Sequence, residues 1–257
     1  MKALAVIPAR YASTRFPGKP LALLGGKPII DYAYEAARKA EGIADVMVAT
    51  DDERIFNHMA ERFGKESVMM TSADHQSGTD RCGEVMHRLA KQDKHYDVVV
   101  NLQGDEPFVE PVQLQLLVDC FRNPEVSIAT LKTRIAATAD LLSPNNVKVV
   151  CADNGKALYF SRQAIPFQRG VEAEEWMEHC DYFKHVGIYA FRSQVLAEVC
   201  NLATSTLERC EKLEQLRWLE AGYAIFVKET AHANIGIDTP ADLEEAERVL
   251  KHIKNNI

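Results

Sequence analysis

The sequence has 257 residues, of which 47% are hydrophobic and 26% are charged, and 30 basic against 37 acidic side chains leave a net charge of −7. This is an ordinary globular composition, and the length accommodates one large domain with a sizeable core. A net acidic chain lacks the broad cationic face that nucleic-acid and membrane-surface binders need, so we expect neither partner. Any site for an anion must therefore be local.

The six cysteines are scattered, with no CxxC and no Cys/His spacing typical of a metal site. We interpret them as reduced thiols, as is usual in a reducing compartment. The first apolar run is too short for a signal peptide, and no stretch of about 20 apolar residues could span a bilayer. These features predict a cytoplasmic location.

The first part of the chain alternates short β-branched runs with amphipathic segments. Strands are expected at residues 3–9, 45–50, 67–71 and 98–102, and helices at residues 28–40, 53–63 and 78–89. The run at 98–102 is apolar on both faces, which is typical of a parallel strand covered by helices on both sides. The βαβα order predicts a three-layer α/β/α sandwich.

After Pro144 the pattern becomes richer in β-structure. Strands are expected at residues 147–151, 157–160 and 185–191, with Asp153-Asn154-Gly155 as the turn between the first two. We expect a smaller β-rich unit at about residues 145–192, a lid or dimerisation element within a single domain of residues 1–257. Helices at 207–221 and 240–253 follow, the second entered through Asp238, Thr239 and Pro240.

A local cationic loop follows the first predicted strand. The first thirty residues contain no acidic side chain and five basic ones: Lys2, Arg10, Arg15, Lys19 and Lys27. The carboxyl end of a parallel strand is where α/β sheets bind ligands, and loop N–H groups there can cradle phosphate. A solvated surface loop would explain the charge as well. The loop contains neither the Walker motif GxxxxGK[ST] nor the dinucleotide motif GxGxxG.

Two carboxylates are candidate metal ligands. Asp105 follows the strand at 98–102 directly after Gly104, where its carboxylate would face the cationic loop. Mg²⁺ prefers a few carboxylate oxygens together with phosphate oxygens of a substrate. An Asp that caps the following helix would look the same. Asp238 is a second candidate, although an Asp before Thr-Pro is also a good helix N-cap.

Eight segments of the chain, taken together, resemble one family of enzymes. They are IPARYASTRFPGKPL (7–21), ATDD (49–52), ADHQSGTDR (73–81), QGDEP (103–107), LYFSR (158–162), HVGIY (185–189), LEQLR (213–217) and GIDTP (236–240). In this order, and over nearly the whole chain, they look like the 3-deoxy-manno-octulosonate (Kdo) cytidylyltransferases, or CMP-Kdo synthetases. Sialic acid cytidylyltransferases have Gly-Ser-Lys in the first loop where this chain has Ala-Ser-Thr-Arg.

The resemblance implies a Rossmann-like nucleotidyltransferase fold and the transfer of CMP from CTP to Kdo, with release of pyrophosphate, for lipopolysaccharide biosynthesis. It implies that Lys19, Arg10 and Asp105 are catalytic, and that Mg²⁺ is the cofactor, held by Asp105 and Asp238. The residues implied to bind CTP are Arg10, Ser13, Arg15, Lys19, Thr71, Ser77 and Gln103. Those implied to bind Kdo are Arg162, His185, Tyr189, Glu214 and Gln215.

The chemistry of the reaction suits these residue types. In-line attack on the α-phosphorus of CTP builds negative charge on the leaving pyrophosphate, so the enzyme needs cations and positioning. A sugar acid needs one cation, here Arg162, and several neutral hydrogen-bonding groups. The family further implies a homodimer, in which the β-rich unit pairs across a two-fold axis and also binds the sugar. An 8-amino variant of Kdo would suit similar motifs.

Two other functions were weighed against this one. An NAD-dependent Rossmann oxidoreductase is disfavoured because the first loop is poor in glycine and no acid follows about twenty residues on to hold the ribose. A nucleotide-binding module without activity is expected to lack one of the two metal-site acids, and this chain has both. The sequence therefore predicts a cytidylyltransferase.

Overall fold

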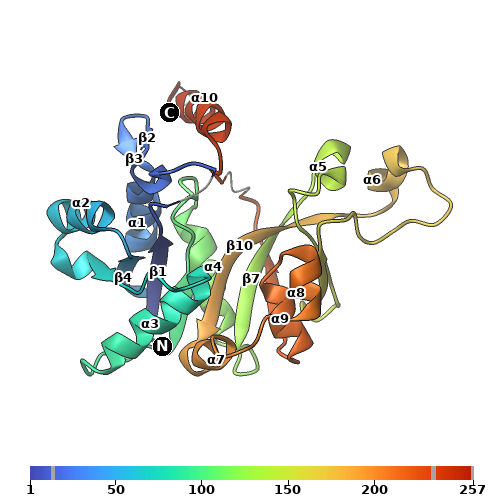
Figure 1. Ribbon diagram of the computed structural model, residues 1–257. Coiled ribbons are helices and arrows are strands. Elements are labelled where there is room, and N and C mark those ends of the chain that lie inside the picture. Colours follow the sequence, from blue (N-terminus) through green and yellow to red (C-terminus); the bar gives the residue numbers. More distant parts are fainter. Residues whose placement is uncertain (13–14, 233–235, 256–257) are drawn as a thin grey trace. The chain divides into compact units, whose positions relative to one another are not determined.

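The structure is a computed structural model that describes residues 1–12, 15–232 and 236–255 (Figure 1). The chain divides into two compact units, one formed by Met1–Val118 together with Asn234–Ile257 and the other by Asp119–Ala233. The β-rich region expected at residues 145–192 lies inside the second unit.

The first unit is built on parallel strands. Their spatial order is β6 (Val98–Asn101), β1 (Ala3–Ala9), β4 (Ile43–Thr50) and β5 (Val68–Met70). β1 pairs in parallel with β4 over its whole length and with β6 on its other side. Its residues from Ala3 to Ile7 are fully buried, as expected of a central strand. The strand predicted at residues 3–9 is confirmed to the residue.

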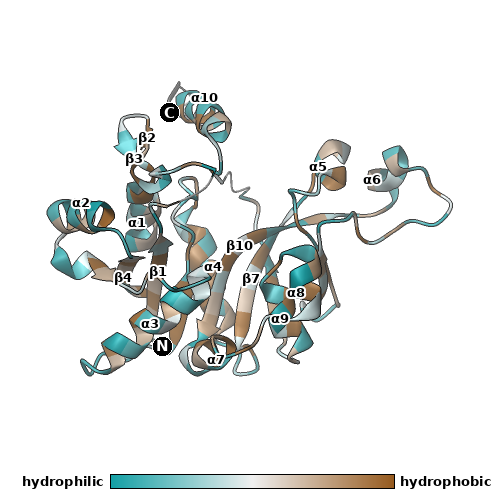
Figure 2. Cartoon of the chain, viewed as in Figure 1, coloured by the Kyte–Doolittle hydropathy of each residue, from teal (hydrophilic) through white to brown (hydrophobic). Residues whose placement is uncertain are grey.

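Helices cover both faces of these strands. α1 (Ile29–Lys39) and α2 (Glu53–Phe63) connect β1 to β4 and β4 to β5, whereas α3 (Gly78–Ala90) runs back from β5 to β6. Right-handed crossovers put α3 on the face opposite α1 and α2. In Figure 2 β1 and β4 are coloured as hydrophobic along most of their length, while α2 and α3 carry both colours, as amphipathic helices do. The predicted three-layer α/β/α sandwich is confirmed.

The last helix packs on the first loop of the same unit. A short 3₁₀ turn at Lys19–Leu21 leads into the hairpin of β2 (Leu23–Leu24) and β3 (Lys27–Pro28). α10 (Pro240–Asn255) covers this hairpin, with Leu24, Ile29, Ile237 and Ala246 fully buried between them. α4 (Pro111–Cys120) follows the loop after β6 and ends the first long segment of the unit.

The second unit has a mixed sheet. β7 (Ile128–Arg134) pairs in parallel with β11 (Ile225–Glu229) and antiparallel with β10 (Phe183–Arg192). β8 (Lys148–Cys151) and β9 (Ala157–Ser161) form the predicted hairpin, with Gly155 at a φ of +81° in the turn. β7 and β11 were not predicted from the sequence.

A β-bulge interrupts the pairing of β10 with β7. Val186 lies opposite Leu131 and Tyr189 opposite Thr130, so β10 advances three residues while β7 advances one. Such a bulge bends the strand and re-aims its side chains. It lies within the HVGIY motif.

The remaining helices of the second unit are short. They are α5 (Thr138–Leu142), α6 (Trp176–His179), α7 (Ser193–Val199), α8 (Thr206–Glu211) and α9 (Gln215–Glu220). The single helix predicted at residues 207–221 is therefore wrong, because Lys212 takes a left-handed conformation with φ of 55° and ends α8. No glycine or proline signals this break in the sequence.

All six cysteines are free thiols. Among the residues that the structure describes, no helix is both long enough and apolar enough to cross a bilayer.

Candidate functional site

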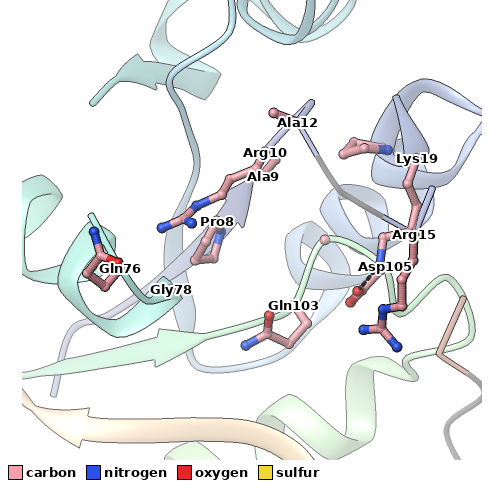
Figure 3. Close-up of a pocket in the computed structure, with 12 residues that line it drawn as sticks. Pro8, Ala9, Arg10, Ala12, Arg15, Lys19, Gln76, Gly78, Gln103 and Asp105 are labelled. Carbon is pink, nitrogen blue, oxygen red and sulfur yellow. Dashed lines mark hydrogen bonds and ion pairs between the residues drawn. The ribbon is translucent and has the colours of Figure 1, made fainter. Parts of the chain in front are cut away.

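A pocket of about 400 Å³ opens in the first unit beyond the carboxyl ends of β1 and β6. Its lining is Pro8, Ala9, Arg10, Ala12, Arg15, Lys19, Pro20, Gln76, Gly78, Gln103, Gly104 and Asp105. Figure 3 shows Arg10 and Gln76 towards one side of this pocket and Lys19 with Asp105 on the other. The pocket therefore brings together the cationic loop, the turn before α3 and the loop after β6.

Lys19 is the most buried cation of this pocket, with 9% of the residue exposed. Its Nζ lies 2.5 Å from Asp105 Oδ2 and 3.1 Å from Asp238 Oδ1. Burial by itself disfavours the charge, but the two carboxylates outweigh the burial and raise the pKa of Lys19. Arg15 adds a second cation, with its guanidinium 3.1 Å from Asp238 Oδ1. The site thus holds fixed positive charge at neutral pH.

The backbone also holds the two carboxylates close together. Ile237 N donates a hydrogen bond of 3.0 Å to the carbonyl oxygen of Asp105. Asp242 Oδ2 accepts hydrogen bonds from the backbone N–H groups of Asp238 and Thr239 at 3.0 and 2.8 Å, and Thr239 Oγ1 accepts one from Asp242 N at 3.2 Å. Thr239 thus caps α10, in place of Asp238, which the sequence suggested as the N-cap. The hydrogen bond from Asp238 N to Asp242 also fixes the backbone of Asp238.

The carboxylates of Asp105 and Asp238 fit a magnesium site. They converge on one ammonium group, and Mg²⁺ is commonly held by one or two carboxylates with substrate phosphates and waters. Within the described residues no group of three or more His, Cys, Asp or Glu side chains forms a closed metal cage. An open site completed by a substrate is what the donor set suits.

The N-terminus of α3 faces the same pocket through Gly78. Ser77 caps this helix in a capping box, accepting from Asp80 N at 3.1 Å while Asp80 Oδ2 accepts from Ser77 N at 3.1 Å. A Cβ on Gly104 would lie 3.1 Å from the Pro8 carbonyl oxygen, so a larger residue there would push the loop after β6 away from β1 by a few tenths of an ångström. A helix N-terminus that opens into a pocket favours the binding of an anion there.

Arg10 is tied to the turn that precedes α3. Its guanidinium donates to the carbonyl oxygen of His75, and His75 Nε2 lies 2.5 Å from Glu84 Oε2. The same carboxylate oxygen accepts from Ser72 N at 2.8 Å. Glu84, nearly two turns into α3, therefore anchors the turn that carries Gln76.

Of the other described residues implied to bind CTP, only Gln103 lines the pocket. The side chain of Thr71 is buried, accepting from the fully buried Arg81 at 2.5 Å and donating to the carbonyl of Thr50 at 3.1 Å. The Ser77 hydroxyl serves the helix cap. Ser13 lies outside the described residues.

A cluster of aromatic and polar side chains in the second unit contains most of the residues implied for the sugar. The rings of His185 and Tyr189 are 5.2 Å apart, and Phe160 packs edge-on against His185 at 5.1 Å. Burial, together with nearby Lys184, lowers the pKa of His185 to about 3, so this imidazole is neutral. Burial likewise raises the pKa of Tyr189.

This cluster holds buried polar atoms that lack protein partners. The hydroxyl of Tyr189 and the indole N–H of Trp218 have none among the described residues, and Trp218 packs edge-on against Tyr189 at 4.9 Å. Glu214, at the N-terminus of α9, acts electrostatically on Tyr189, and Gln215 beside it is 5% exposed. Unpaired buried donors of this kind usually find water or a ligand.

Arg162 lies just beyond β9, and backbone carbonyls hold its guanidinium. Nε donates to Glu211 O at 2.7 Å, and the two terminal nitrogens donate to Pro144 O at 3.1 Å and Lys212 O at 3.4 Å. A guanidinium has five N–H groups, so one remains on each terminal nitrogen, enough for an end-on pair with a carboxylate. Arg162 therefore stabilises the turn between α8 and α9, and two of its N–H groups remain available to a ligand.

Comparisons with known proteins identify the family of this chain. The cytidylyltransferase family model matches residues 4–231. The 3-deoxy-manno-octulosonate cytidylyltransferase of Bacteroides thetaiotaomicron is 51% identical over 98% of this chain and 99% of its own length. That of Phocaeicola vulgatus is 52% identical over 98% of each. The chain belongs to the 3-deoxy-manno-octulosonate cytidylyltransferases.

A solved structure supports the same family. The CMP:2-keto-3-deoxy-manno-octonic acid synthetase complexed with CTP is 44% identical, with a TM-score of 0.89 over 98% of this chain and 99% of that one. The nucleotidyltransferase fold expected from the sequence is thereby confirmed, and the chain is a nucleotidyltransferase.

Several residues that organise the sites of this family member were not found from the sequence. Glu84 anchors the turn at residues 72–77, and Glu211 accepts from Arg162 N at 3.0 Å and Ser161 Oγ at 2.7 Å. Lys148 is fully buried, and its ammonium donates to three carbonyls, including that of Arg162 at 2.5 Å. For Glu211, the sequence offers one weak indication of a special role. It is a carboxylate at the C-terminal end of a helix, where the helix dipole disfavours a negative charge.

Proposed function

We propose that this enzyme transfers the cytidylyl group of CTP to the anomeric hydroxyl of Kdo, giving CMP-Kdo and pyrophosphate for lipopolysaccharide synthesis. The observation that carries the proposal is the pocket in which Lys19 joins Asp105 and Asp238 in a chain whose relatives are named for this reaction. The hydroxyl oxygen of Kdo forms a bond to the α-phosphorus, and the bond from that phosphorus to the pyrophosphate oxygen breaks.

The first unit would bind the nucleotide. Arg10, Arg15 and Lys19 line the pocket and would neutralise the triphosphate and the charge that grows on the leaving pyrophosphate. The N-terminus of α3 adds backbone donors at Gly78. We assign recognition of the cytosine to the turn at residues 71–79 and to Gln103, and include Ser13 among the triphosphate ligands by family resemblance.

We propose that Asp105 and Asp238 hold Mg²⁺ in the presence of CTP. When bound, the ion supplies charge neutralisation at the phosphates and polarises the attacking hydroxyl. In the structure Lys19 lies beside both carboxylates, where its positive charge limits the repulsion between them. A change of charge at any one of these three side chains therefore affects the other two.

The second unit would bind the sugar acid. Arg162 would pair with the carboxylate of Kdo through its two remaining N–H groups, and its brace on the turn after α8 places Glu214 and Gln215. His185 and Tyr189 would bind sugar hydroxyls, since the Tyr189 hydroxyl lacks a partner among the described residues. Most of the site is polar but uncharged, as a polyol requires.

Pyrophosphate release tests this function directly. The enzyme is mixed with CTP, Mg²⁺ and Kdo, and each component is omitted in turn. We expect release only in the complete mixture, and CMP-Kdo as the second product by mass spectrometry. Equal release without Kdo would indicate a CTP hydrolase, and no release in the complete mixture would contradict the proposal.

We further propose that the enzyme is a homodimer and that it works in the cytoplasm. Leu158 on β9 is 63% exposed beside a groove of about 750 Å³ in the second unit, which is apolar surface that a second copy could cover. The six free thiols suit a reducing compartment, where CTP is also made.

A further inference from the structure

The bulge of β10 brings two sugar-site residues together, and one threonine fills it. In a regular strand, residues four apart are separated by about 13 Å. The rings of His185 and Tyr189 are nevertheless 5.2 Å apart, because the extra residues Gly187 and Ile188 loop out of the pairing with β7. The position of the pair therefore depends on how this bulge is held.

Thr130, on β7 opposite the bulge, is fully buried. Its Oγ1 lies 2.8 Å from the carbonyl oxygen of Ile188, 3.1 Å from that of Val186 and 2.9 Å from His185 Nε2. The two carbonyls have lost their regular ladder positions at the bulge and need donors. One hydroxyl thus contacts both arms of the bulge and the imidazole.

The proton count at this hydroxyl determines the tautomer of His185. A threonine hydroxyl has one proton to donate, and a carbonyl oxygen can only accept. If the proton goes to Ile188 O, the shorter of the two carbonyl contacts, then Oγ1 must accept from the imidazole. Donation to the imidazole instead would leave both carbonyls facing oxygen lone pairs without a proton.

We propose that Thr130 is a positioning residue that holds His185 in the Nε2–H tautomer, so that Nδ1 is a hydrogen-bond acceptor for a hydroxyl of the sugar substrate. Within the described part of the chain Nδ1 has no hydrogen-bond partner. The neutral state of this buried imidazole agrees with the assignment. The site then offers an acceptor at His185 next to a donor at Tyr189, which suits a polyol. This role for His185 depends on the proposed function, whereas the tautomer does not.

The first test is spectroscopic and needs no substrate. In ¹⁵N NMR of the imidazoles, with His185→Gln used to assign the signal, we expect a pyridine-type Nδ1 and a pyrrole-type Nε2. Thr130→Val keeps the shape of the side chain but removes the hydroxyl, and we expect it to abolish this fixed pattern. A pyrrole-type Nδ1 in the parental enzyme would overturn the proposal, whatever Thr130→Val does to stability.

The second test is kinetic. We expect Thr130→Val to raise KM for Kdo by about 10-fold, the cost of one misplaced hydrogen bond, with KM for CTP unchanged. Thr130→Ser restores the hydroxyl and should stay within about two-fold of parental values. Thr133→Val, a buried threonine on the same strand, is the matched control and should leave both constants unchanged.

The outcomes separate the two proposals. A parental Kdo KM in Thr130→Val, or equal defects in Thr130→Ser and Thr130→Val, would overturn the role of Thr130. A parental enzyme that does not use Kdo, but shows the expected imidazole signals, would refute the proposed function and leave the tautomer assignment standing.

Discussion

Lys19 shows how a few side chains at the nucleotide pocket depend on one another. Its ammonium lies between two carboxylates that would repel each other in its absence, and 11% of its side chain is exposed. Removing one partner of a buried ion pair costs more than the pair itself contributes, because a charge is left uncompensated. Substitutions here therefore change both the charge and the geometry of the site.

We expect Asp105→Asn to lower kcat by at least about 100-fold while the protein stays folded, because the site loses one of the two carboxylates proposed for Mg²⁺ and the closest partner of Lys19. Activity is measured across Mg²⁺ concentrations, with circular dichroism to confirm folding. Asp93→Asn, at a fully exposed carboxylate, is the control and should behave as the parent. Parental turnover in Asp105→Asn would disprove the metal assignment.

His185 gives the stability of the enzyme a dependence on pH. The pKa of His185 is about 3 in the folded protein, against an ordinary value of 6.5 for histidine, so between these values the unfolded chain binds the extra proton and the folded one does not. The stabilising contribution is complete above about pH 6.5 and is lost as the pH falls towards 3, by up to about 1.4 kcal/mol per pH unit.

Urea unfolding between pH 7.5 and 5 measures this effect. His185→Gln removes the titrating group, so we expect its free energy of unfolding to fall less steeply with decreasing pH than that of the parent. His95→Gln, at an imidazole with 71% exposure, should retain the parental slope. Identical slopes for the parent and His185→Gln would mean that the imidazole is not held neutral.

At the scale of elements, the break between α8 and α9 is the clearest departure from the sequence analysis. The run at residues 207–221 has leucines at helical spacing and no breaker, so a single helix was predicted. The chain turns at Lys212 because Arg162 binds the carbonyls of Glu211 and Lys212, a contact made across 49 and 50 residues of sequence. A local sequence pattern cannot reveal a partner so distant in the sequence.

The left-handed turn at Lys212 is testable by substitution. The left-handed conformation costs a residue with a Cβ about 1–2 kcal/mol of folding free energy, and it costs a β-branched residue more. We expect Lys212→Gly to be neutral or to stabilise by up to about 1 kcal/mol, and Lys212→Val to destabilise by more than about 1 kcal/mol. Urea midpoints compare them, and equal midpoints for the two variants would contradict the assigned conformation.

The elements and site residues that could be predicted from the sequence are those that local patterns determine. β1 and α2 were located to the residue because apolar runs and helical periodicity are local. The cationic loop and Asp105 were found because both follow strands that end at the same edge of a parallel sheet. By contrast, the roles of Thr130, Lys148 and Glu211 rest on hydrogen bonds with backbone groups that are distant in sequence. Composition and spacing do not reveal such partners, nor the pairing of β7 with β10 and β11.

At the scale of the whole molecule, the exposed apolar surface of the second unit predicts self-association. If a second copy covers Leu158, then Leu158→Glu places a charge in the interface, and we expect the parent to sediment as a dimer at micromolar concentration and this variant as a monomer. Val112→Glu, on a 42% exposed position of the first unit, is the control and should remain dimeric. A monomeric parent would refute the homodimer.

The discontinuity of the first unit has a consequence for how the enzyme is made. Lys19 and Asp105 belong to its first segment, whereas Asp238 belongs to the second, which follows the whole of residues 119–233. On the ribosome, the nascent nucleotide pocket therefore exists for some time with one carboxylate beside Lys19 instead of two. Because domains fold as they emerge, the second unit is synthesised before the second carboxylate arrives. A ribosome-bound chain can thus present the cationic loop, but both carboxylates proposed for Mg²⁺ are present only after residue 238 has been added.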